Sequence, residues 1–120
     1  MKLKHLVIDW WVDNPDFLDH AGPFQRVLKK ALSVAGFNSV GEKFHDFDPK
    51  GFTGFVLLSE SHVSVHSWWE EGLITLDVFS CRPEGLDCFV DLIRREIRPK
   101  AEAVREIPRG VAFHLDKRGV

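Results

Sequence analysis

Residues 51–81 read GFTGFVLLSESHVSVHSWWEEGLITLDVFSC, and this stretch carries the features that decide the fold. Its first run, residues 52–59, is almost continuously apolar and predicts a strand buried on both faces. Glu70-Glu71-Gly72 predicts a hairpin-like turn, and the run beyond it alternates as a strand does. One face of that strand would carry Thr75, Asp77, Phe79 and Cys81, and the other Ile74, Leu76, Val78 and Ser80. A polar cluster separates the two runs: Ser59, Glu60, Ser61, His62, Ser64 and His66.

The flanking sequence predicts the other elements of a single domain, residues 1–120. Residues 3–12 alternate as a strand, and apolar residues recur at helical spacing after Gly22-Pro23 and again after Pro83. Stop signals follow these two helices at Gly36 and Pro99. Further strands are expected at 38–47, 101–107 and 111–115. The order β-α-β-β-β-α-β-β predicts an α+β fold, a two-layer sandwich with an antiparallel or mixed sheet and two main helices on one face.

Composition narrows the functional class. A net charge of −2 and a pI near 6.3 give no reason to expect a nucleic acid or a membrane surface as partner. No apolar run approaches the roughly 18 residues that a membrane-spanning helix needs. Acidic residues follow the N-terminus too soon for a secretory signal. Without a secretory context, the two cysteines, Cys81 and Cys88, predict reduced thiols in the cytoplasm.

Four chemistries are open to the polar cluster. A metal site at His62 and His66 is rejected, because Val63 and Val65 alternate with them as in a strand, where four residues span about 13 Å. We therefore expect no metal. A serine hydrolase is disfavoured, because Ser61 lies in no G-x-S-x-G elbow. A cysteine nucleophile paired with His66 stays open, as does self-processing of a serine. By residue type alone, Ser61 is a polar strand end and His66 a surface histidine.

The run SESHVSVHSWWEEG, followed by TLDVFSC, resembles the prokaryotic type of S-adenosylmethionine decarboxylase proenzyme, a pyruvoyl-dependent family. The family pattern is approximately SESH-x-(S/T)-x-HTWPE-x-G, and then D-x-F-(T/S)-C. The resemblance is strong over residues 44–81 and weaker but collinear at His5-Leu6-Val7. Beyond Cys81 it extends only to the order of the elements. Several chemically unusual residues match together, which makes the pattern specific.

The resemblance implies that the chain cuts itself between Glu60 and Ser61, giving a beta chain of residues 1–60 and an alpha chain of residues 61–120. In the family, the hydroxyl that matches Ser61 attacks the carbonyl matching Glu60 and replaces the amide by an ester. His66 matches the base that takes the proton whose loss eliminates this ester. Residue 61 then becomes a pyruvoyl group. The chemistry needs a serine held in a strained backbone with a base nearby.

The same resemblance assigns the catalytic and binding residues of the processed enzyme. The pyruvoyl group forms a Schiff base with the substrate amine and accepts electrons as carbon dioxide leaves. Cys81 matches the acid that then donates a proton. Phe47 and Trp68 match aromatic residues that stack on the adenine, which suits a cationic ligand. Glu70 matches the glutamate that binds the ribose hydroxyls.

The chain departs from the family pattern next to these residues. Trp69 stands where the family has proline, Glu71 where it has an aromatic residue, and Arg82 where glycine usually follows the cysteine. Glu71 is therefore a candidate contact for a basic group of the substrate. Some relatives decarboxylate arginine or ornithine with the same pyruvoyl machinery, and they supply an alternative function.

The expected function is autoprocessing, pyruvoyl-dependent decarboxylation of S-adenosylmethionine for polyamine (spermidine) biosynthesis. The alternatives are an L-arginine or L-ornithine decarboxylase on the same scaffold, and an uncleaved regulatory paralogue. A small-molecule substrate is the expected partner. Pockets of the family commonly form between protomers, so the resemblance implies a homodimer of processed units, whose sheets would meet face to face.

Overall fold

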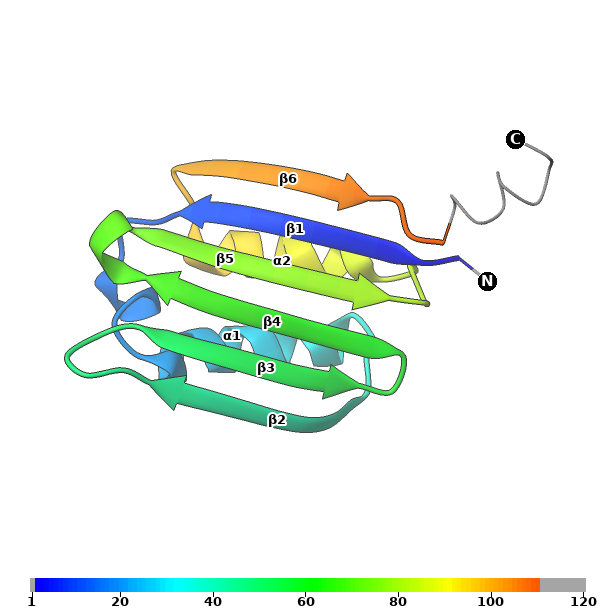
Figure 1. Cartoon of the computed structure of the whole chain (residues 1–120), viewed down its shortest axis with the longest axis horizontal. Helices are drawn as coiled ribbons and strands as arrows, with labels where there is room; N and C mark the ends of the chain where they lie inside the picture. The colour runs from blue at the N-terminus through cyan, green and yellow to red at the C-terminus, as the bar shows by residue number, and fades with distance from the viewer. Residues whose placement is uncertain (1, 111–120) are drawn as a thin grey trace.

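The computed structural model describes residues 2–110. Its elements are β1 (Lys4–Trp11), η1 (Pro15–Phe17), α1 (Ala21–Val34), β2 (Ser39–Asp46), β3 (Phe52–Leu58), β4 (Ser61–Trp68), η2 (Trp69–Glu71), β5 (Leu73–Ser80), α2 (Leu86–Ile97) and β6 (Ala101–Ile107). The strands form one sheet in the order β2-β3-β4-β5-β1-β6, and each neighbouring pair is antiparallel. Both helices lie behind this sheet in Figure 1. The predicted α+β sandwich is confirmed, with an antiparallel rather than a mixed sheet.

The core lies between the two helices and one face of the sheet. Every second residue of β1 is buried there, as Leu6, Ile8 and Trp10 show. Each helix turns one apolar side to the sheet. The largest fully buried side chains come from both layers: Trp10, Phe24, Phe52, Phe89, Ile8 and Leu28. The alternation of β1 and the helical spacing of α1 and α2 thus match the faces that the structure buries.

Helix α1 is capped at both of its ends, by a carboxylate of β2 at the first and by its own backbone at the second. The backbone N–H of Ala21 donates to Asp46 Oδ1 at 2.7 Å, which places a carboxylate at the positive end of the helix. At the other end Gly36 has a φ of +84°, and the N–H of Phe37 donates to the carbonyl of Leu32 at 2.9 Å. The predicted stop at Gly36 is confirmed, and it directs the chain into β2.

The edge strand β6 is held by a buried indole and a guanidinium. Glu102 Oε1 accepts from Trp10 Nε1 at 2.8 Å and from Arg94 Nε at 2.9 Å. The hydrogen bond from Trp10, and after it the bond and positive charge of Arg94, hold the pKa of Glu102 below its usual value of 4.5. One carboxylate thus joins β1, β6 and α2.

The strand alternation predicted around Val63 and Val65 is confirmed, because the polar cluster forms β4 from Ser61 onward. The predicted element order was one strand short, since four strands rather than three lie between the helices. Residues 52–59 are not buried on both faces, because Phe55 and Leu57 are 43% and 48% exposed while Val56 between them is fully buried. An apolar run predicts two covered faces, but here the helices cover only one.

The helix boundaries follow their capping signals closely. Asn14 caps the short η1, accepting from Asp16 N at 3.0 Å, and α1 begins separately at Ala21. The chain between β1 and β2 thus forms a short helix followed by a longer one. Helix α2 begins at Leu86, three residues after Pro83, and ends at Ile97 before Arg98-Pro99. The strand predicted at 111–115 lies outside the described residues.

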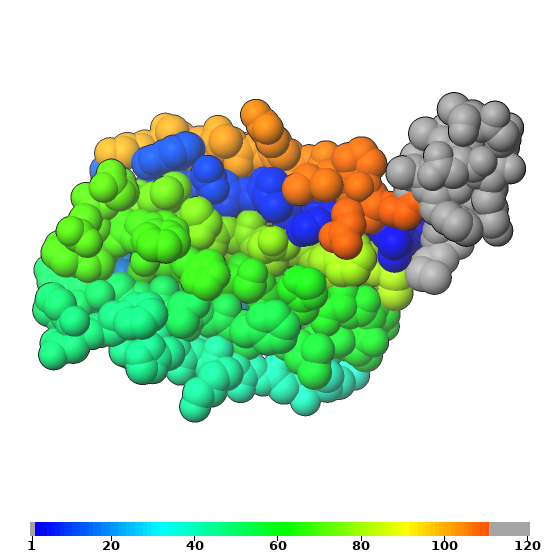
Figure 2. Space-filling view, in the orientation of Figure 1, coloured from blue at the N-terminus to red at the C-terminus, as the bar shows by residue number. Residues whose placement is uncertain are grey.

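The other face of the sheet has no helix over it. Figure 2 shows this face, which the strands' own side chains form. We call it the open face. It carries the residues opposite in phase to the core, among them His5, Phe55, His62, His66, Trp68, Asp77 and Phe79. Trp68 is 51% exposed, so a large apolar surface lies uncovered in a single chain.

Candidate active site

The predicted cleavage site lies in the tight turn between β3 and β4. Leu58 pairs with Ser61, which leaves Ser59 and Glu60 as a two-residue turn. The N–H of Ser59 donates to the carbonyl of Asn38 at 3.0 Å, and its hydroxyl donates to Glu60 Oε2 at 2.9 Å. Neither turn residue has a positive φ. The strained backbone expected here is therefore not found in these angles; instead, the turn is held by fixed contacts.

Ser61 is the first residue of β4, and its hydroxyl has an unusual environment. Its Oγ is shielded from solvent and has no hydrogen-bond partner. Ser61 is in phase with the buried Val63 and Val65, so its side chain lies on the helix side of the sheet. A buried hydroxyl without a partner costs about 1–3 kcal/mol and requires an explanation. A hydroxyl kept free to attack the preceding carbonyl provides one, so this residue fits the predicted origin of a pyruvoyl group.

Cys81 lies directly beside the predicted cleavage site. It follows the end of β5, whose Ser80 is paired with Ser61. The thiol donates to the carbonyl oxygen of Glu60 at 3.4 Å, and the backbone N–H of Cys81 points to the same oxygen at 3.5 Å. The antiparallel register thus brings together residues that are 21 positions apart in the chain. Cys81, Glu60 and Ser61 form one cluster, as the resemblance requires.

His66 is not part of this cluster within one chain. It lies five positions beyond Ser61, a span of about 16 Å along the strand, and on the open face. Its Nδ1 is 2.6 Å from the hydroxyl of Thr53 on β3. The imidazole therefore cannot reach the α-hydrogen of Ser61 in the same chain. His62 and His66 both lie on β4, which confirms the strand on which the rejection of a shared metal site was based.

The predicted substrate-binding residues meet at the far end of β4. Phe47, Trp68, Glu70 and Glu71 line one hollow of about 300 Å³ together with Lys50, Gly51, Ser67 and Trp69. Phe47 and Trp68 expose about half of their surface, 48% and 51%. The ammonium group of Lys50 lies 5.3 Å from the ring centre of Trp69, the residue that replaces a family proline. This hollow has aromatic walls and two carboxylates, a combination that suits a flat cationic ligand.

The two groups of residues occupy opposite ends of one strand. Trp68 lies seven positions beyond Ser61, which is about 23 Å along an extended chain. A smaller hollow of about 200 Å³ lies between them on the open face and includes His66, Asp9 and Asp77. A single chain therefore presents the cleavage chemistry and the binding hollow as separate features.

A third cluster on the open face was missed by the sequence analysis. His5 Nε2 lies 2.6 Å from Asp77 Oδ1, and Arg109 Nη1 lies 3.1 Å from His5 Nδ1. A guanidinium only donates, so Nδ1 must accept and Nε2–H must donate to Asp77. The guanidinium also lies 4.9 Å from the ring centre of Phe79. His5 and Phe79 are partners in the β1–β5 register. The alternation predicted for these two strands, together with their pairing, would have indicated the contact between His5 and Asp77.

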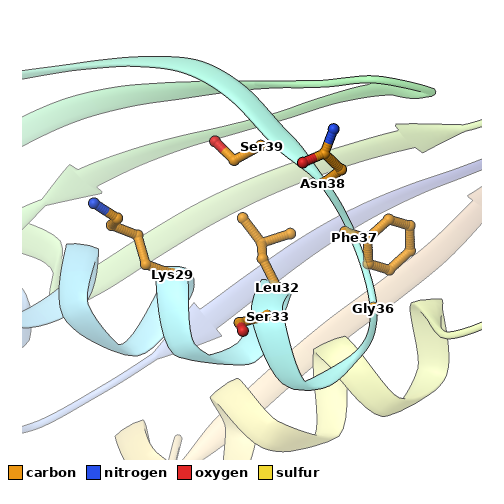
Figure 3. Close-up of a pocket in the computed structure, with 7 residues that line it drawn as sticks. All are labelled: Lys29, Leu32, Ser33, Gly36, Phe37, Asn38 and Ser39. Atoms are coloured by element: carbon orange, nitrogen blue, oxygen red, sulfur yellow. The ribbon is translucent and has the colours of Figure 1, made fainter.

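The largest of these hollows contains none of the predicted site residues. It measures about 430 Å³ and lies between the end of α1 and the start of β2, as Figure 3 shows. Its lining residues are Lys29, Leu32, Ser33, Gly36, Phe37, Asn38 and Ser39. It borders the predicted cleavage site only indirectly: the carbonyl of Asn38 accepts from the N–H of Ser59, and Gly36 accepts a hydrogen bond from Arg82 at 3.0 Å. Its size alone does not make it the active site.

Residues 2–110 hold neither a clustered metal site nor a membrane-spanning helix. No group of three or more His, Cys, Asp or Glu side chains in this part of the chain is arranged to hold a metal ion. Among the same residues, no helix has the length and apolar character needed to cross a membrane. Cys81 and Cys88 are both free thiols.

Comparison with known proteins decides the family. The family model described as S-adenosylmethionine decarboxylase matches residues 4–110. This chain belongs to the S-adenosylmethionine decarboxylase family. It is 33% identical over 112 residues to the S-adenosylmethionine decarboxylase proenzyme of Methanococcus maripaludis, covering 90% of this chain and 89% of that protein. It is 32% identical over 120 residues to the proenzyme of Persephonella marina, covering 94% and 90%.

The fold agrees with that of a solved member of the family. The crystal structure of adenosylmethionine decarboxylase from Aquifex aeolicus superposes with a TM-score of 0.83 at 31% identity, covering 90% of each chain. The resemblance seen in SESHVSVHSWWEEG is thus confirmed over nearly the whole length. The comparisons support S-adenosylmethionine decarboxylase and give no support to the two alternative functions.

Proposed function

We propose that this protein cuts itself between Glu60 and Ser61 and then decarboxylates S-adenosylmethionine. The observation that carries the proposal is the pairing of two unusual groups at one peptide bond. Ser61 Oγ is buried without a partner, and the carbonyl oxygen of Glu60 is contacted by Cys81. A serine hydrolase would need a base beside the hydroxyl, and no such contact exists for Ser61 in the described residues.

Self-cleavage uses only groups of the chain. Ser61 Oγ attacks the carbonyl carbon of Glu60, the hydroxyl proton passes to the departing amide nitrogen, and an ester replaces the amide. A base then removes the α-hydrogen of Ser61, and the Cβ–Oγ bond breaks. Glu60 leaves with the carboxylate, giving chains 1–60 and 61–120. The dehydrated residue 61 takes up water and releases ammonia, which leaves the pyruvoyl group.

The pyruvoyl group supplies an electrophilic carbonyl that binds the substrate amine and withdraws electrons as carbon dioxide leaves. Cys81 lies next to residue 61 and is the proposed donor of the proton that replaces the carboxylate. Phe47 and Trp68 stack on the adenine, and Glu70 binds the ribose hydroxyls. Glu71 faces the same hollow and is proposed to attract the sulfonium charge rather than a basic amino acid.

The separation along β4 supports a homodimer with shared sites. The binding hollow and His66 lie about 23 Å and about 16 Å from Ser61 along β4, too far to serve it in the same chain. A two-fold axis through the open face places the Trp68 end of one protomer over the Ser61 end of its partner. The exposed Phe55 and Leu57 would be covered by the same contact. His66 would then act as the base on the partner's Ser61.

Two further expectations complete the proposal. Neither cysteine is in a disulfide, and we expect the enzyme to work in the cytoplasm, where thiols stay reduced. We also expect the pyruvoyl group to be the one prosthetic group, without a metal.

Intact-mass analysis and a carbon dioxide assay test the proposal together. The purified protein should give masses for residues 1–60 and 61–120, and the second fragment should react with a carbonyl reagent. Labelled carbon dioxide should be released from S-adenosylmethionine, but not from arginine or ornithine. A full-length, unreactive protein would contradict self-cleavage, whereas release from arginine or ornithine alone would contradict the substrate.

A further inference from the structure

We infer that the contact of Trp69 with Lys50 keeps Phe47 in position to stack on the adenine. The inference rests on the proposed function, because it concerns the hollow in which Phe47 and Trp68 would hold the base. Trp69 and Lys50 are thus positioning residues, which act on the substrate through Phe47.

The walls of this hollow come from two separate turns. Phe47 belongs to the connection between β2 and β3, residues 47–51, whereas Trp68 ends β4 and Trp69 begins η2. Both turns lie at the left of Figure 1, at the same end of the strands. The rings of Phe47 and Trp68 therefore keep a fixed separation only if contacts join the two turns.

The connection 47–51 folds back on itself and is attached to the chain that precedes α1. The N–H of Phe47 donates to the carbonyl of Gly51 at 2.8 Å, and the N–H of Gly51 donates to the carbonyl of Asp19 at 2.8 Å. Lys50 Nζ lies 3.7 Å from Asp19 Oδ2. Gly51 has a φ of +97°, a conformation that glycine adopts without strain. The backbone that carries Phe47 therefore has defined partners.

Trp69 joins this connection to η2. The ammonium group of Lys50 lies 5.3 Å from the centre of the indole, within the range of a cation–π contact. A Cβ at Gly51 would lie 3.2 Å from Trp69 Cδ1, so the indole packs closely against the backbone of the connection. Trp69 itself is partly buried and packs against the core. The indole thus links the wall that carries Phe47 to the wall that carries Trp68.

The departure from the family pattern gives this contact a purpose. Proline, the family residue at this position, restricts its own backbone φ, and tryptophan does not. Phe47 is 48% exposed, and ordering such a side chain when a ligand binds lowers the affinity. His45 supports the Phe47 ring from β2, with 4.9 Å between the ring centroids, while Trp69 fixes the connection itself. The ring is therefore in place before the ligand arrives.

Steady-state kinetics of the cleaved enzyme with S-adenosylmethionine test the inference. Trp69→Ala should raise KM about three- to tenfold, the range expected when one side chain must be ordered on binding, while kcat changes less than about twofold. Adenosine carries the base and the ribose but no amine, and its inhibition constant should rise by the same factor. Trp69→Phe keeps a ring for Lys50 and should restore most of the affinity. An unchanged KM in Trp69→Ala, or a loss confined to kcat, would contradict the inference.

Lysine variants test the contact without removing a packed side chain. Lys50→Met removes the charge and should raise KM about two- to fivefold, the range of an exposed cation–π contact, whereas Lys50→Arg should keep KM near its unmodified value. Lys29→Met is the matched control, because it removes another lysine that forms an ion pair, with Glu42 at 2.9 Å, and it should leave KM unchanged. If Trp69→Ala fails to fold, as judged by thermal melting, equal KM values for Lys50→Met and Lys50→Arg overturn the inference.

A double variant shows whether Trp69 acts through Phe47. In the Phe47→Ala background, Trp69→Ala should change KM less than about twofold, because the ring that it positions is gone. Two effects that multiply would mean that Trp69 contacts the ligand directly, and would overturn the inference. An unmodified chain that fails to cleave itself, or that releases no carbon dioxide from S-adenosylmethionine, would instead refute the proposed function.

Discussion

The two ends of β4 differ in burial and in the tasks that we propose for them. At the Ser61 end a buried hydroxyl has no hydrogen-bond partner. The thiol of Cys81, directly after β5, donates to the neighbouring carbonyl oxygen of Glu60. At the Trp68 end the aromatic rings are half-exposed and line an open hollow with two carboxylates. Bond rearrangement needs atoms of one chain held in contact, which strand register provides. Ligand binding needs surfaces that the chain itself leaves uncovered. The half-exposed rings of Phe47 and Trp68 are such surfaces.

The largest expected difference between the two ends is in self-cleavage. Ser61→Ala should abolish cleavage completely, because no hydroxyl remains to attack. Trp68→Ala should leave cleavage complete but raise KM roughly tenfold or more, since stacking of a base on an aromatic ring is worth about 1–3 kcal/mol. Intact mass measures the first effect and steady-state kinetics the second. An uncleaved Trp68→Ala protein would show that the two ends are not independent.

Mixing defective chains tests whether the ends cooperate across a dimer. Ser61→Ala and Glu70→Gln chains should each be inactive or nearly so alone, but a co-expressed mixture should regain about a quarter of the unmodified activity. Half of randomly formed dimers are mixed, and each mixed dimer holds one intact site of two. Separately purified dimers provide the control. No recovery on co-expression would place both ends of each site in the same chain.

Two adjacent leucines test which face of the sheet is covered within a chain. Leu58 is 3% exposed and Leu57 is 48% exposed. Leu58→Ala should lower the free energy of unfolding by about 2–5 kcal/mol, whereas Leu57→Ala should change that of the monomer by less than about 1 kcal/mol. Urea unfolding in the Ser61→Ala background, which keeps the chain whole, measures both. Sedimentation should show Leu57→Ala weakening the dimer; equal losses of stability would contradict an open face.

The smallest expected effect is a loss of local stability in acid, and it is expected only near the Trp68 end of the sheet. Glu102 pairs with Trp10 in the β1–β6 register, in the row that also holds Ile74 and Ser67. Because its pKa is lowered in the folded protein, its contribution to stability is present above the unfolded pKa and is lost as pH falls through the folded value. The protection factors of the β6 amides against hydrogen exchange should therefore fall below about pH 4.5, while the protection factor at Ser61 should change less.

Glu102→Gln is the matched control for this prediction. It keeps the shape of the side chain but removes the titrating carboxylate, so the acid-dependent part of the exchange should disappear. If the variant keeps the full acid response, another group is responsible for it.

Particular residues show how far sequence reasoning extends. The phases of β1 and β5, the stop at Gly36 and the cluster of Phe47, Trp68 and Glu70 were all predicted, because each depends on local periodicity, a turn or a motif. The contact between His5 and Asp77 was missed, because it depends on which strands are neighbours. The exposure of Phe55 was predicted wrongly, because an apolar side chain does not say what covers it.

The sequence by itself determined the strands, the helices and the family, since these follow from side-chain alternation, helical spacing and the motif around Ser61. Only the tertiary structure decided that Cys81 touches the carbonyl of Glu60 while His66 lies far from Ser61. The physical reason is that antiparallel register joins distant positions at the ends of hairpins, whereas an extended strand separates residues that are close in sequence. Proximity in this protein is a property of the sheet.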